Sequence, residues 1–213
     1  MTSPPSLSRG KPVYLLAAAV MASAMGFIDS SVTAIALPAI RASLGGTLAT
    51  AQWVQAGYLL AVTALVLVGG AMSDRFVVVR VFQGGIVAFM AASLLCAIAP
   101  SMPLMIAARV LQGVGAAFMV PGSMTLVSRA YDRADRGRAL GLWAAASTAT
   151  TAAGPILGGL VLTLGGEGVW LVIFAMNLPL GAGALWLLAR HAIPDRCRGT
   201  PLHPGRLRAH GIA

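Results

Sequence analysis

Residues 104–127 read LMIAARVLQGVGAAFMVPGSMTLV, an apolar run in which Arg109 is the only charged side chain. An α-helix rises about 1.5 Å per residue, and about 20 such residues cross a hydrocarbon core of roughly 30 Å. This stretch is therefore long enough to span a membrane. Three similar runs precede it and two follow, and the full set is residues 13–37, 52–72, 81–99, 104–127, 139–164 and 169–189.

The composition of the whole chain agrees with these six runs. Hydrophobic residues make up 58% of it and charged residues only 10%, whereas soluble domains carry about 25% charged residues. The sequence thus predicts an all-α integral membrane protein with six transmembrane helices. The net charge of +9 would suit nucleic-acid binding if the basic residues formed one face. They lie between the spans instead, so no nucleic-acid partner is expected.

The basic residues cluster on one side of an alternating six-span topology. Only Arg41, in an opposite-side loop, and Arg109, inside a span, fall elsewhere. The positive-inside rule then predicts that both termini lie in the cytoplasm. The expected location is the plasma membrane. The clustered residues are Arg9, Lys11, Arg75, Arg80, Arg129, Arg133, Arg136, Arg138, Arg190, Arg196, Arg198, Arg206 and Arg208.

Three segments follow from this topology. Residues 1–12 are expected to be a cytoplasmic N-terminal segment, and residues 13–190 the six-helix transmembrane domain. Residues 191–213 are rich in Pro, Arg, Gly and His, so we expect a disordered cytoplasmic tail. The opposite-side loops are expected at residues 38–51, 100–103 and 165–168.

Two ionisable residues, Asp29 and Arg109, lie inside the predicted spans. Counted at 1.5 Å per residue, both fall in the outer half of the membrane at similar depth. A charge at a helix centre costs about 2.5–3.5 kcal/mol, and mutual pairing would remove much of that cost. One interpretation is an acid that handles a proton or a substrate, with a nearby cation that tunes it. The alternative is snorkelling of Arg109 and local capping by Asp29 beside Ser30 and Ser31.

Further polar side chains gather in the same outer region of the spans. Together they suggest a water-accessible pocket open toward the outer face. Each of them alone would also fit an ordinary interhelical hydrogen bond. These residues are Gln55, Tyr58, Gln112 and Asn177.

The fifth span has an unusual composition of small residues around a proline. Residues 144–153 contain only Ala, Ser and Thr, and the motif Gly154, Pro155, Gly158 and Gly159 follows. Small residues let helix backbones approach closely in a bilayer. Pro155 removes a backbone donor and bends the helix, either as a passive kink or as part of a moving element.

Three short motifs resemble those of one known family, and they occur in the same order and in the same spans and loops as in that family. Residues 70–76 (GAMSDRF) with Arg80 resemble the loop signature of the major facilitator superfamily, which latches helix ends on the cytoplasmic side. Residues 108–115 (ARVLQGVG) resemble its span-four motif, whose Arg is linked to proton coupling. Residues 153–159 (AGPILGG) resemble its antiporter motif of span five. The matching positions of the loop signature are Gly70, Asp74, Arg75 and Arg80.

Other segments resemble the fourteen-helix drug:proton antiporter branch of that superfamily. They are residues 27–38 (FIDSSVTAIALP), 53–59 (WVQAGYL) and 169–181 (VWLVIFAMNLPLG). One departure concerns the loop signature, because Val77, Val78 and Val79 stand where Gly-Arg-Arg is usual. The latch is therefore expected to be weakened.

The resemblance implies the amino-terminal six-helix half of such a transporter, built as a three-plus-three inverted repeat. The implied function is proton-coupled efflux of drug-like or other small organic compounds by a truncated or half-length chain. Asp29 would be the proton or cationic-substrate site, with Arg109 beside it. Gln55, Tyr58, Gln112 and Asn177 would line the cavity. No cofactor or metal is implied other than the proton as coupling ion.

The expected partners are the lipid bilayer, a cationic or hydrophobic small molecule, and a second six-helix half. One alternative is a parallel homodimer, because two copies with cytoplasmic termini insert in the same direction. Another is an inactive fragment or a non-transporting membrane protein. An enzyme is not favoured, because the spans contain no paired carboxylates, metal cluster or nucleophile with a base.

Overall fold

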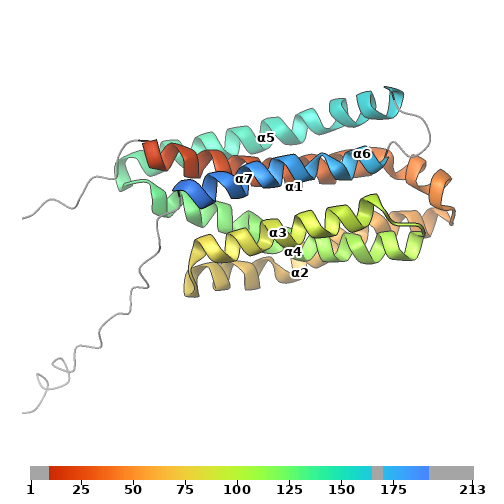
Figure 1. Ribbon diagram of the computed structural model, residues 1–213, viewed down its shortest axis with the longest axis horizontal. Coiled ribbons are helices and arrows are strands. Elements are labelled where there is room, and N and C mark those ends of the chain that lie inside the picture. The colour runs from red at the N-terminus through yellow and green to blue at the C-terminus, as the bar shows by residue number, and fades with distance from the viewer. Residues whose placement is uncertain (1–9, 165–169, 192–213) are drawn as a thin grey trace, which may run out of the picture.

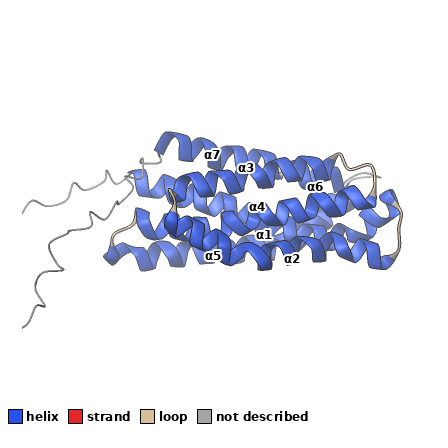
Figure 2. Cartoon of the chain, turned by 90° about the horizontal axis from the view of Figure 1, so that it is seen from below, coloured by secondary structure: helices blue, strands red, loops and turns tan. Residues whose placement is uncertain are grey.

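The computed structural model describes residues 10–164 and 170–191, and this part of the chain is helical with short connections (Figures 1 and 2). The expected segment 1–12, loop 165–168 and tail 191–213 lie wholly or mostly outside it. The helices run up and down in chain order. They are α1 (Gly10–Leu44), α2 (Leu48–Arg75), α3 (Val78–Ala97), α4 (Met102–Ala130), α5 (Arg133–Leu164), α6 (Trp170–Ala175) and α7 (Asn177–His191).

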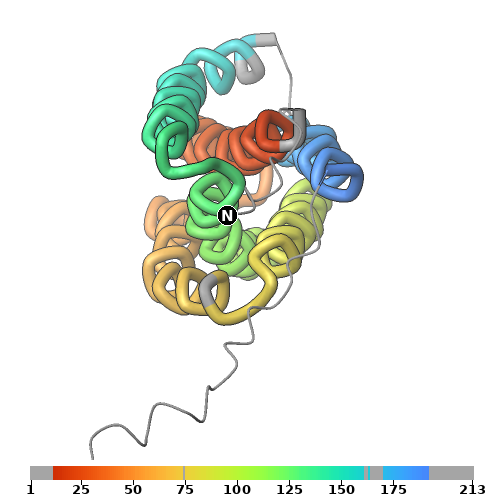
Figure 3. Tube along the Cα trace, turned by 90° about the vertical axis from the view of Figure 1, so that its left-hand side faces the viewer, coloured from red at the N-terminus to blue at the C-terminus, as the bar shows by residue number. Residues whose placement is uncertain are grey.

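The helices pack in two layers, which are visible end-on in Figure 3. In one layer α1 lies between α5 and α7, and in the other α4 lies between α2 and α3. The central helices α1 and α4 also pack against each other. The chain order α1–α2–α3 therefore mirrors the order α4–α5–α6/α7, as an inverted repeat requires. Each central helix is flanked by helices of the other repeat.

Five helical segments have the length and composition of a membrane span within the described residues. They are residues 12–44, 48–73, 78–97, 102–130 and 170–191. The predicted fifth span, in α5, is not among these five segments. It nevertheless packs along α1 in the bundle (Figure 1).

The first of the expected outer loops, residues 38–51, is much shorter than predicted. Helix α1 continues through Pro38 to Leu44, and the chain turns at Gly45 and Gly46, which have φ angles of 74° and 109°. Such positive φ values favour glycine. Thr47 then caps α2, with its hydroxyl accepting from the Thr50 N–H at 3.2 Å. Arg41 accordingly lies in the last turn of α1 and not in a loop.

The predicted sixth span is interrupted at Met176. Helix α6 ends at Ala175 and α7 begins at Asn177. Pro179 explains the break, because it has no N–H and its ring clashes with the carbonyl of Ala175 four residues earlier. The sequence analysis expected one continuous helix here. The break puts Asn177 at the first position of α7.

Candidate functional site: a buried ion pair

Asp29 and Arg109 form a direct ion pair between the two central helices. The Asp29 Oδ2 to Arg109 Nη1 distance is 2.5 Å. Asp29 is 1% exposed and Arg109 is fully buried. Snorkelling of Arg109 to the membrane surface is therefore the wrong interpretation, because its guanidinium stays inside the bundle.

The guanidinium of Arg109 is held from three helices. Its Nε donates to the carbonyl of Val54 at 3.2 Å and its Nη2 to Gln55 Oε1 at 3.3 Å, both on α2. Its Nη1 also donates to Gln112 Oε1 at 2.6 Å within α4. The Tyr58 ring lies 4.3 Å from the guanidinium carbon, close enough for a cation–π contact. Arg109 thus fixes α2 and α4 around the Asp29 carboxylate.

The second carboxylate oxygen of Asp29 is held by two amides. Asp29 Oδ1 accepts from Gln112 Nε2 at 3.0 Å and from Asn177 Nδ2 at 2.8 Å. Both amides also donate to Ser93 Oγ of α3, at 2.7 and 3.2 Å. Side chains of α1, α2, α3, α4 and α7 therefore meet in one network.

Ser93 is the member of this network that the sequence analysis missed. A serine in a membrane helix usually bonds to a carbonyl of its own preceding turn, so a single serine in residues 81–99 gave no distinct signal. The spacing of Ser93 from its neighbours could have shown that it faces the interior of the bundle. Ser93 lies four residues after Phe89 and three before Cys96, and all three are buried on one face of α3.

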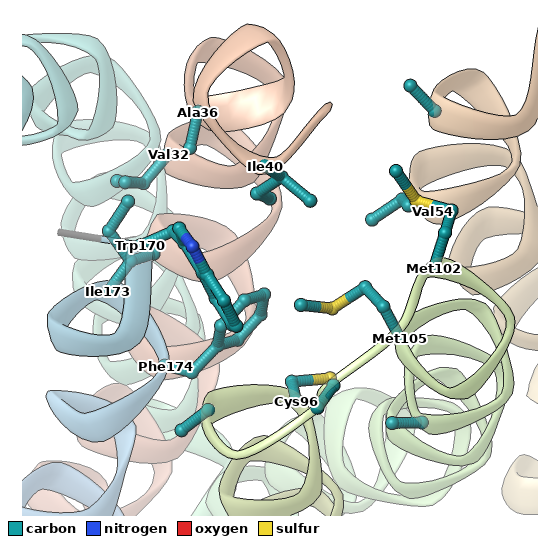
Figure 4. Close-up of a cluster of buried hydrophobic side chains, with 14 of the residues drawn as sticks. Val32, Ala36, Ile40, Val54, Cys96, Met102, Met105, Trp170, Ile173 and Phe174 are labelled. Carbon is teal, nitrogen blue, oxygen red and sulfur yellow. The ribbon is translucent and has the colours of Figure 1, made fainter. Parts of the chain in front are cut away.

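Apolar clusters close the network from both ends. Toward the α1–α2 turn lie Val32, Val54, Met105, Trp170 and Phe174 (Figure 4). The other end is closed by Met25, Phe89 and Met119, among others. The side chains of Asp29, Arg109, Gln112 and Asn177 are buried, and Gln55 is partly exposed. The structure thus shows a largely buried network at the place where a water-accessible pocket was expected.

The loop motif lies at the end of the bundle that carries most of the basic residues. Arg75 and Arg80 are exposed there, and no neighbour lies within 4 Å of a side chain added at Gly70. The side chain of Asp74 lies outside the described part. Val78 is buried beside Phe82, so this valine packs the start of α3 into the core. Arg129 Nη2 links α4 to α2 by donating to the Ser73 carbonyl at 3.3 Å.

The helix-five motif divides into packed and unpacked positions. A Cβ added at Gly154 would lie 2.5 Å from Ser31 Cβ, and one at Gly158 would lie 3.1 Å from Val32 Cγ1, both on α1. Among the described residues, nothing lies within 4 Å of a Cβ added at Gly159, and Pro155 is exposed. Gly154 and Gly158 therefore set how closely α5 approaches α1, next to Asp29.

This division makes a testable prediction about α5. Gly154→Ala is expected to destabilise the protein by about 1–3 kcal/mol, because the new methyl group overpacks the α1–α5 contact. Gly159→Ala is the matched control and is expected to be neutral or stabilising by about 0.5–1 kcal/mol, since alanine favours helix where space allows. Thermal unfolding in detergent, followed by tryptophan fluorescence, measures both. Equal effects of the two substitutions would contradict the assignment.

The described residues contain no group of three or more His, Cys, Asp or Glu side chains that could hold a metal ion. The site itself consists of one acid, one guanidinium and the amides around them. Such a group can bind or release a proton and can exchange one hydrogen-bond pattern for another.

The sequence pattern of the Major Facilitator Superfamily matches residues 19–208, and the chain belongs to this family of membrane transporters. It is 39% identical to the methylenomycin A resistance protein of Bacillus subtilis, with 76% of this chain and 34% of that protein aligned. It is 36% identical to the tetracenomycin C resistance and export protein of Streptomyces glaucescens, with 86% and 34% aligned.

Among solved structures, the chain is similar to a bacterial homologue of the human lysosomal transporter Spinster in an inward-facing, unoccupied conformation. The TM-score is 0.72 at 21% identity, over 92% of this chain and 47% of that one. This likeness concerns the fold. The chain spans about a third of the length of the two resistance proteins.

Proposed function

We propose that the six-helix body is the amino-terminal half of a proton-coupled transporter that exports small organic compounds. The observation that carries the proposal is the buried Asp29–Arg109 pair between the central helices of the two repeats. Family membership makes transport the general activity. The resistance and export functions named for the relatives favour antibiotic-like substrates, cationic or hydrophobic in character.

The charge balance of the pair suits coupling to protons. With Asp29 ionised, the site is neutral and can stay buried. A proton on Asp29 leaves the charge of Arg109 without a counter-ion, and an uncompensated buried charge is strongly unfavourable. Protonation therefore favours a state in which water reaches the site. A ligand that binds one state better than the other shifts the equilibrium in this way.

In the proposed arrangement, the basic end faces the cytoplasm of a cell whose plasma membrane holds the protein. Substrate passes between this half and a second six-helix half, near the middle of the membrane. The second half is either part of the same polypeptide or a separate one. A second copy of this chain is one such separate partner, since two copies would insert in parallel.

Proton coupling can be tested in proteoliposomes. The purified protein is reconstituted with a pH-sensitive dye inside, and a panel of fluorescent organic cations and hydrophobic antibiotics is added on one side. We expect substrate movement with opposite proton movement, and loss of both when an ionophore collapses the pH gradient. Substrate transport that ignores the gradient would contradict proton coupling. Crosslinking of the active sample then shows whether two copies assemble.

A further inference from the structure

In the side-chain amide of Asn177, the nitrogen has hydrogen-bond partners but the oxygen has none among the described residues. Asn177 is fully buried at the first position of α7. Its two Nδ2 hydrogens have the acceptors Asp29 Oδ1 at 2.8 Å and Ser93 Oγ at 3.2 Å. Within the described part of the chain, its Oδ1 is buried without a hydrogen-bond partner. Buried acceptors normally accept a hydrogen bond, so this orientation of the amide leaves the Asn177 oxygen without the donor that it needs.

The contacts of Asp29 decide which of its oxygens can carry a proton. Oδ2 faces the guanidinium of Arg109 at 2.5 Å, and a guanidinium can only donate. A proton on Oδ2 in that direction would point at the N–H group of Arg109, which cannot accept it. Oδ1 faces only the amides of Gln112 and Asn177, and in this structure both present their N–H groups to it. A proton on Oδ1 therefore needs one of these amides to present its oxygen.

Of these two amides, only Asn177 is free to reverse. Gln112 Oε1 accepts from Arg109 Nη1 at 2.6 Å, so turning that amide would place an NH2 group against the guanidinium. The oxygen of Asn177 has no such contact. The terminal torsion of asparagine is broad and roughly two-fold, so a half-turn exchanges nitrogen and oxygen with little other movement. The Ser93 hydroxyl can follow, because it can donate as well as accept.

We propose that Asn177 reverses its side-chain amide when Asp29 is protonated and thereby holds the transported proton. A hydronium ion transfers its proton to Asp29 Oδ1: its O–H bond breaks, the new Oδ1–H bond forms, and a neutral water molecule leaves. The new acid O–H donates to Asn177 Oδ1, while Oδ2 continues to accept from Arg109. The Ser93 hydroxyl turns to donate to the same Asn177 oxygen. Asn177 is a positioning residue here, and this inference rests on the proposed proton coupling.

The location of Asn177 connects this reversal to the fold. Asn177 directly follows the break at Met176. A change in its hydrogen bond to Asp29 of α1 therefore acts on the start of α7. The other charged or titratable groups around the carboxylate are Arg109 of α4, Tyr58 of α2 and Cys96 of α3. Asp29 is the carboxylic acid among them, and the proposal therefore assigns the proton to it.

The sequence offers a direct probe, because Asn177 is the only asparagine of the chain. Protein labelled with 13C and 15N in asparagine alone gives one side-chain amide signal by NMR in lipid nanodiscs. Infrared spectroscopy of the same sample follows the carboxyl band of Asp29 as pH is lowered. At the pH midpoint of that band, we expect the Asn177 side-chain carbonyl carbon to move downfield, because its oxygen gains a hydrogen bond. An amide proton should move upfield as it leaves the carboxylate.

The control is the variant Asp29→Ser/Arg109→Met, which keeps the site neutral and adds no asparagine. Its Asn177 signals should not change over the same pH range. A wild-type carboxyl band that titrates while the carbonyl carbon stays fixed would overturn the reversal, and so would a carboxyl that never titrates. If the reversal occurs in a protein that moves no substrate in proteoliposomes, the switch stands and the transport proposal fails.

Discussion

Asp29→Asn is expected to abolish the proton-driven part of transport in proteoliposomes. The amide keeps the size of the side chain but cannot take up a proton, so no group at this site binds the proton that the pH gradient would drive across the membrane. The measurement is substrate movement and internal pH in the dye-loaded vesicles described above. A small residual movement down the substrate gradient is compatible with the proposal, because it needs no proton.

The matched control is Asp135→Asn, which makes the same change at an exposed acid in the first turn of α5. It should transport at the wild-type rate. Full gradient-driven activity of Asp29→Asn would remove Asp29 from the coupling mechanism. Because the substitution leaves Arg109 without its counter-ion, the folded fraction of each variant is checked by size-exclusion chromatography before transport is compared.

The second large effect concerns stability. Arg109→Met is expected to destabilise the protein by about 3–5 kcal/mol, because it leaves the Asp29 carboxylate buried without its cation. Asp29→Asn should cost a similar amount for the converse reason. The double variant Asp29→Asn/Arg109→Met removes both charges, so its loss should be smaller than the sum of the single losses by about 3 kcal/mol. Unfolding in mixed micelles of mild and denaturing detergent measures the whole cycle.

Arg138→Met is the control for this cycle, because Arg138 is exposed near the start of α5. It is expected to change stability by less than about 0.5 kcal/mol. Additive losses in the cycle would show that the two charges do not stabilise each other. The double variant should also fail to couple protons, which separates the stability of the pair from its proposed use.

The sequence predicted Asp29, Arg109, Gln112 and Asn177 because polar side chains are rare in long apolar runs. The rise per residue was enough to place Asp29 and Arg109 at one depth. It could not show whether they face a cavity or one another, since depth carries no information about the direction of a side chain. The structure buries both side chains and directs them at one another.

Other features were missed for local reasons. Pro38 suggested the end of a helix, yet α1 continues to Leu44, because a membrane helix tolerates the loss of one backbone hydrogen bond. Pro179 does interrupt its helix, as the α6–α7 break shows. The two prolines look alike as letters in a sequence. Their surroundings in the bundle decide between a continued helix and a break.

Each central helix is flanked by helices of the other repeat, and this arrangement has a consequence for how the chain enters the membrane. Asp29 and Arg109 are separated by 80 positions, and α5 and α7, which flank α1, follow later still. During synthesis, α1 is therefore made well before its counter-ion and its neighbours. An unpaired acid at the centre of a membrane helix costs about 2.5–3.5 kcal/mol. The insertion machinery must bear this cost, or Asp29 must enter protonated, until α4 arrives.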